Sequence, residues 1–154
     1  MTHMYEGLEA IADLAARHQL RVLIIGPSPM QRFDAAHCLA VRREKDCAVS
    51  ADAMSTYAAP SLRVLERLAR ERNNVRVIDP MLFMCARGQC PVVIGDVIAY
   101  SDDDHVSATF ARAASQNYDE PLAWLVGRSA SVSVGGNEPC DFPMLASCAG
   151  RVGR

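Results

Sequence analysis

Two short runs of apolar residues constrain the fold of this chain more than any other feature of its sequence. Residues 21–26 (RVLIIG) and 75–79 (VRVID) are rich in branched aliphatic side chains, and a proline follows each run. Such runs are typical of strands that a parallel sheet buries on both faces. Residues 4–18 and 60–72, which precede the two runs, repeat apolar side chains at helical spacing. This alternation of helix and strand with short joins predicts a layered α/β domain.

Outside these four segments the pattern is weaker. The helix of residues 60–72 is expected to begin at Pro60, because a first helical turn does not need the N–H that proline lacks. Residues 30–53 are polar and mixed, whereas residues 91–100 suggest a short strand or hairpin. A last amphipathic helix is expected to open near Asp104.

The chain has 154 residues, the size of one domain. Residues 1–116 are interpreted as that domain, and residues 117–154, which show no clear periodicity, as an irregular tail. The net charge of −2 argues against nucleic acid and anionic membranes as partners. No stretch approaches the ~20 continuous apolar residues that cross a bilayer. Glu6, Glu9 and Asp13 lie where a signal peptide would have a basic start and an apolar run.

The cysteines suggest an oxidising compartment. They form three close pairs: Cys38 with Cys47, Cys85 with Cys90, and Cys140 with Cys148. An even number in short loops favours disulfides, which are predicted for the first two pairs. Free buried thiols and a metal site are the alternatives, but no pair has the Cys-x-x-Cys spacing of a zinc site. Cysteines of this kind without an export signal predict that the chain is part of a longer, exported protein, located outside the cytoplasm or in the periplasm.

One segment carries candidate chemistry. Asp102 precedes His105 by three residues, so its carboxylate can reach one imidazole nitrogen and leave the other free to accept a proton. Asp102 is the candidate orienting acid and His105 the candidate general base. The alternative is a solvated acidic turn that caps the last helix, with Asp104 near the positive end of the helix dipole. A Mg²⁺ or Ca²⁺ site is weaker, because no second carboxylate cluster accompanies this one, and no metal is predicted.

The surrounding residues form a familiar ordered string: Val77-Ile78-Asp79-Pro80, the cysteines Cys85 and Cys90, and Tyr100-x-Asp102-x-x-His105-x-Ser107. Together with the upstream VLIIGPSPM, this string resembles the end of an SGNH (GDSL-like) hydrolase domain. It is most similar to the SGNH domain fused to membrane acyltransferases that O-acetylate cell-surface polysaccharides. The resemblance covers roughly residues 5–115, and Val106 replaces the leucine usual in that group.

The resemblance implies a three-layer α/β/α domain with a parallel sheet, the flavodoxin-like SGNH fold. It also implies a substrate loop at Gly26, Pro27, Ser28 and Pro29. The Gly-Asp-Ser motif that carries the family's nucleophile is absent, so the domain is expected to be incomplete on its amino-terminal side. Ser28 lies between two prolines and is favoured as a turn residue, which leaves the nucleophile unknown.

The implied function is that of a serine-type O-acyltransferase or esterase domain acting on acetylated cell-envelope carbohydrate, with Asp102 and His105 as its acid–base pair. The implied partners are an acyl donor, a carbohydrate hydroxyl and a membrane acyltransferase domain in a longer parent, and no cofactor is expected. Alone, the chain is expected to be inactive. The alternative is a non-catalytic remnant that binds or assembles, as a homo-oligomer through an exposed sheet edge. Nucleotide binding is disfavoured, since neither strand precedes a glycine-rich loop.

Overall fold

The structure is a computed structural model that describes residues 2–127; Cys140, Cys148 and most of the segment expected to be a tail lie outside these residues. The elements follow in this order: α1 Thr2–Arg17, β1 Val22–Ile25, α2 Ala35–Val41, η1 Glu44–Cys47, β2 Val49–Ser50, α3 Ala51–Glu71, β3 Val75–Ile78, α4 Met81–Met84, β4 Gln89–Cys90, β5 Val93–Ile94, β6 Val97–Ile98, α5 Ala108–Ala113, η2 Ser115–Tyr118 and α6 Asp119–Leu125. Within this part of the chain, no helix combines the length and the apolar character needed to cross a membrane.

The two apolar runs form a parallel pair of strands, so the prediction of an α/β fold with parallel strands is confirmed. β1 pairs with β3 in a register that matches Val22 with Val75 and Ile25 with Ile78. Two short antiparallel pairs accompany them, β2 with β4 and β5 with β6. The described residues thus contain a two-stranded parallel sheet, and the larger three-layer sheet stays a prediction.

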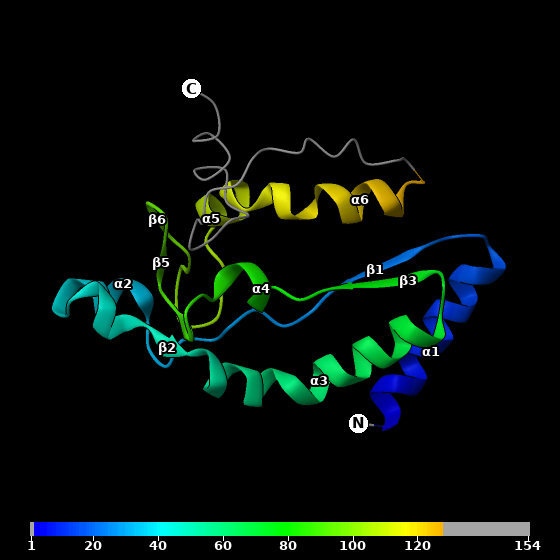
Figure 1. The fold of residues 1–154 in the computed structure, drawn as a ribbon, viewed down its shortest axis with the longest axis horizontal. Coiled ribbons are helices and arrows are strands. Elements are labelled where there is room, and N and C mark those ends of the chain that lie inside the picture. The colour runs from blue at the N-terminus through cyan, green and yellow to red at the C-terminus, as the bar shows by residue number, and fades with distance from the viewer. Residues whose placement is uncertain (1, 128–154) are drawn as a thin grey trace.

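Helices lie on both sides of the β1–β3 pair (Figure 1). On one side, α1 and α3 pack against the strands through a small core that contains Ala12, Leu68 and Val75. On the other side lies α6, together with α5 at the carboxyl ends of the strands (Figure 1). Helices therefore pack against both faces of the pair, where Val75 and Ile78 are buried, whereas Ile25 and Arg76 stay exposed.

The largest core lies beyond the carboxyl ends of the parallel strands. Its biggest fully buried side chains are Tyr100, Phe110 and Met84. Two disulfides lie at the edge of this core. Cys38–Cys47 joins α2 to η1, and Cys85–Cys90 joins the end of α4 to β4. Both pairings were predicted from the sequence.

The predicted start of the long helix is wrong. α3 begins at Ala51 and runs through Pro60 to Glu71. Its first turn is stabilised by Ser50, whose hydroxyl accepts a hydrogen bond of 3.2 Å from the N–H of Ala53. Burial of apolar side chains before Pro60 outweighs the loss of one backbone hydrogen bond at the proline.

The last helices also differ from the prediction. α5 begins at Ala108, because the Ser107 hydroxyl accepts from the N–H of Phe110 at 3.1 Å and so caps the helix. The segment after residue 116, predicted to be irregular, contains the short helix α6. Trp124 on α6 lies under the guanidinium of Arg76, 4.5 Å from the ring centroid. The division of the chain into a domain and a tail stays a prediction.

Candidate active site

The acidic residues Asp102, Asp103 and Asp104 lie at the tip of a tight loop between β6 and α5. An isolated bridge joins Tyr100 to Val106 at the base of the loop. The N–H of Ser101 donates to the carbonyl of His105 at 2.9 Å, and the N–H of Ser107 donates to the carbonyl of Ala99 at 2.8 Å. These backbone hydrogen bonds therefore fix the conformation on both sides of the tip without a contribution from side chains.

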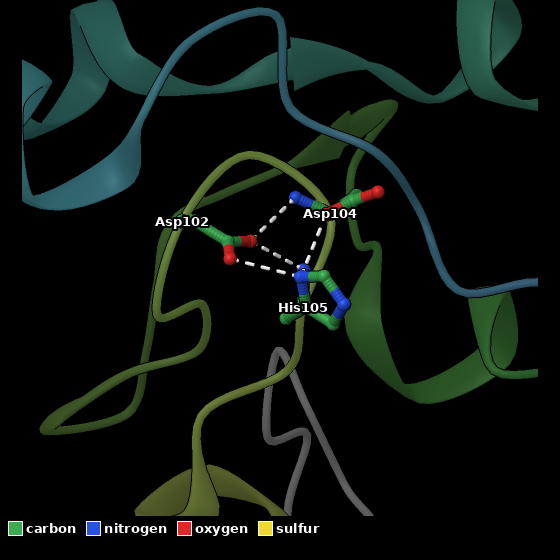
Figure 2. Close-up of side chains that lie close together, drawn as sticks. All are labelled: Asp102, Asp104 and His105. Atoms are coloured by element: carbon green, nitrogen blue, oxygen red, sulfur yellow. Dashed lines mark hydrogen bonds and ion pairs between the residues drawn. The ribbon is translucent and has the colours of Figure 1, made fainter.

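The carboxylate of Asp102 organises the tip of this loop (Figure 2). One of its oxygens, Oδ1, accepts from the backbone N–H of His105 at 2.7 Å and from that of Asp104 at 3.0 Å. The other oxygen, Oδ2, lies 2.8 Å from Nδ1 of the His105 ring. The N–H of His105, followed by that of Asp104, lowers the pKa of Asp102 to about 2. Asp102 is thus an ionised acceptor at neutral pH.

The His105 ring is held from one side and open on the other. Its Nδ1 lies 2.8 Å from Asp102 Oδ2 and equally 2.8 Å from Asp104 Oδ1, while its side chain is 75% exposed. The hydrogen bond to Asp102, with the charges of Asp102 and Asp104, raises the pKa of His105. The hydrogen bond to Asp102 and the second carboxylate beside Nδ1 favour the neutral tautomer that carries its proton there, which leaves Nε2 with a free lone pair.

The loop after β1 is hydrogen-bonded to the backbone of the acidic tip. The N–H of Gln31 donates to the carbonyl of Asp103 at 2.7 Å, and the N–H of Ala35 donates to that of Asp102 at 3.3 Å. These bonds bring the predicted substrate loop beside the predicted acid–base pair, although about 70 residues separate them in the sequence. Spacing along the chain carries no signal for such backbone contacts, and sequence reasoning missed them.

Two of the four predicted loop residues, Gly26 and Ser28, line a pocket of about 280 Å³ beside Val106. Pro29 is instead fully buried. Close packing favours glycine at position 26, because a Cβ there would lie 3.0 Å from Leu62 Cδ2 and 3.1 Å from the carbonyl oxygen of Ile78. The hydrogen bonds found among the described residues do not join Ser28 to His105, so Ser28 gains no support as a nucleophile.

The same tip could also contact a cation. Ligand atoms of Asp102, Asp104 and His105 all lie within 4.8 Å of one another. Those atoms already satisfy one another, however, and all three residues come from one exposed loop. A hard cation prefers oxygen ligands from several directions. The hydrogen-bonded arrangement therefore accounts for the geometry without a metal.

These features define a class of protein: an α/β domain that presents an imidazole backed by carboxylates next to an apolar pocket. A family model described as "SGNH domain (fused to AT3 domains)" matches residues 2–120. The chain belongs to this SGNH family, which makes it a domain of acyltransferase or esterase type and confirms the resemblance found in the sequence. No curated protein and no solved structure matches the chain.

Proposed function

We propose that this chain supplies the general base and its orienting acid to a serine-type O-acyltransferase or esterase domain. His105 is the base and Asp102 the acid. The observation that carries the proposal is the 2.8 Å contact between Asp102 Oδ2 and His105 Nδ1, on a ring whose side chain is 75% exposed. Such a ring can accept a proton at Nε2 while the carboxylate stabilises the imidazolium that forms.

The proposed reaction has two acyl transfers. A serine Oγ bonds to the carbonyl carbon of the acyl donor while its proton passes to Nε2 of His105. The imidazolium then protonates the leaving oxygen as the donor's ester bond breaks, which leaves an acyl-serine. A sugar hydroxyl or a water next attacks this ester, and its proton passes to Nε2. Return of that proton to the serine oxygen breaks the acyl–serine bond, which releases the acylated sugar or, with water, the free acid and restores the enzyme.

The nucleophile is proposed to come from another segment of a longer parent or from a complementing chain. Two features support this arrangement. The sequence contains no Gly-Asp-Ser, because Gly95-Asp96 is followed by Val97. In addition, the second edge of β1 has no partner strand among residues 2–127. Further parallel strands beside β1 would complete the three-layer sheet.

Family membership supports the proposed substrates and location but fixes neither, so both are part of the proposal. A domain related to those fused to AT3 domains is proposed to act on acylated carbohydrate of the cell envelope, on the extracytoplasmic side. A membrane acyltransferase domain in the same parent would supply the acyl group.

The direct test is hydrolysis of p-nitrophenyl acetate by this chain joined to, or mixed with, the segment that supplies the serine, with and without His105→Ala. Loss of the base should reduce kcat/KM by about a thousandfold or more. His18→Ala is the matched control, since His18 is an exposed histidine after α1, and it should leave the rate unchanged. Turnover that survives in His105→Ala would contradict the proposal.

A non-catalytic assembly module is the second candidate, and one observation favours it. Backbone groups alternate direction along a parallel strand, so those of Leu23 and Ile25 face the edge of β1 opposite β3. Ile25 is also 57% exposed. If the chain shows no turnover even with the serine-bearing segment present, self-associates in light scattering, and loses that association in Ile25→Lys, this candidate replaces the catalytic one.

A further inference from the structure

The pocket beside the candidate site has almost entirely apolar walls. They come from the end of β1 and from α4, α5 and η2, which lie near one another at the carboxyl ends of the strands (Figure 1). Its largest lining side chains are Phe83, Met84, Phe110 and Tyr118. The rings of Phe83 and Tyr118 meet edge to face, with centroids 5.8 Å apart. Among residues 2–127, no Asp, Glu, Lys, Arg or His lines this pocket, so the described surface suits an uncharged, apolar group.

The pocket shares two chain segments with the candidate site. Val106 contributes to its wall and directly follows His105 in the chain. Gly26 and Ser28 line it as well, and the loop that they begin donates a backbone hydrogen bond of 2.7 Å from Gln31 to the carbonyl of Asp103. Both segments that form the candidate site thus also form the pocket.

The size of the pocket determines what fills it. A dry protein cavity of about 150 Å³ holds benzene, with its six carbons. This pocket has a volume of about 280 Å³ and opens to solvent. An acetyl group would place a single methyl in it and leave the remaining apolar wall in contact with water. A longer chain would cover that wall.

We infer that this pocket binds the acyl chain of the substrate and that it selects chains of at least about six carbons rather than acetyl. The inference rests on the proposed acyl-transfer function and names its acyl group. Each methylene that enters the pocket leaves water, which improves affinity by about threefold to fourfold. Discrimination against acetyl therefore grows with every carbon until the pocket is full.

Binding of uncharged alcohols tests this inference without requiring catalysis. ¹H–¹⁵N NMR titrations compare ethanol, 1-butanol and 1-hexanol, which the carboxylates of the acidic loop do not repel. In the wild type, 1-hexanol should shift the resonances of Phe83 and Phe110 saturably and bind at least tenfold more tightly than 1-butanol. Equal affinity for the three alcohols would overturn the inference.

Substitutions in α5 test whether 1-hexanol binds in this pocket. Ala111 lines the pocket and is itself exposed, so Ala111→Phe fills the space without disturbing the core and should weaken 1-hexanol at least tenfold. Ala111→Met should give an intermediate loss. Thr109→Phe adds the same ring on the other side of the helix, away from the pocket lining, and should bind as the wild type does. Unchanged binding in Ala111→Phe would overturn the inference.

His105→Ala separates the two proposals. This variant should retain 1-hexanol binding, because His105 does not line the pocket. If 1-hexanol binds selectively while His105→Ala leaves esterase activity unchanged, the assignment of the pocket is supported and the proposed function is wrong. If His105→Ala abolishes activity but chain length does not affect binding, the proposed function stands and the pocket assignment fails.

Discussion

Gly26 is the position where a single methyl group should disturb the site most clearly. A Cβ there would lie 3.0 Å from Leu62 Cδ2, 3.1 Å from the carbonyl oxygen of Ile78 and 3.6 Å from Pro80 Cδ. Leu62 can rotate away, but the carbonyl of Ile78 cannot, because it accepts a 2.8 Å hydrogen bond from the N–H of Gly26 itself. Gly26→Ala must therefore separate the ends of the two parallel strands slightly.

Two opposing effects set the magnitude of the change. Overpacking of a tight site costs about 1–3 kcal/mol. Replacement of glycine by alanine also lowers the conformational entropy of the unfolded chain, which stabilises the folded protein by about 0.4–1 kcal/mol. The net expectation is a loss of about 1–2 kcal/mol in the free energy of unfolding, which lowers Tm by about 2–8 °C in a chain of this size.

The assay is thermal and urea unfolding followed by circular dichroism, with Gly7→Ala as the matched control. Gly7 lies within α1 and a Cβ there would meet nothing within 4 Å, so alanine should raise stability by about 0.5–1 kcal/mol. Opposite signs for the two variants support the packing argument. A Gly26→Ala protein as stable as the wild type would refute it.

Two further predictions concern stability. The pKa of Asp102 is lowered to about 2 in the folded protein, so this carboxylate stabilises the fold fully above about pH 4. That stabilisation is lost as the pH falls toward 2. Stability should therefore fall more steeply with acid in the wild type than in Asp102→Asn. Reduction of the disulfides Cys38–Cys47 and Cys85–Cys90 should lower stability by about 2–3 kcal/mol each. Thiol counting after denaturation should find at least four fewer free thiols than after reduction, and an unchanged count would contradict the pairing.

The sequence predicted the features that depend on local pattern and spacing. Residues 21–26 and 75–79 carry strands because continuous branched aliphatic runs have few other stable arrangements in a domain of this kind. The Asp102–His105 hydrogen bond followed from a separation of three residues, which brings the two side chains together on one turn.

Features that depend on tertiary contacts were not predictable in the same way. Pro60 suggested a helix start, yet the cap at Ser50 and the apolar face buried before the proline carry α3 through it. The second carboxylate at His105, from Asp104, depends on the conformation of a tight loop. Backbone support from Gln31 depends on how two distant loops meet. None of these leaves a periodic signal in the sequence.

The central claim is that carboxylates at Nδ1 orient His105 as a base, and ¹⁵N NMR of the histidine ring across a pH titration tests it most directly. The account predicts a neutral ring protonated at Nδ1 and a pKa above the ordinary value of about 6.5, because of the hydrogen bond to Asp102. The pKa should fall in Asp102→Asn and fall further when Asp104→Asn is added, while Asp103→Asn should change it least. A neutral ring protonated at Nε2, or a pKa that Asp102→Asn leaves unchanged, would contradict the account.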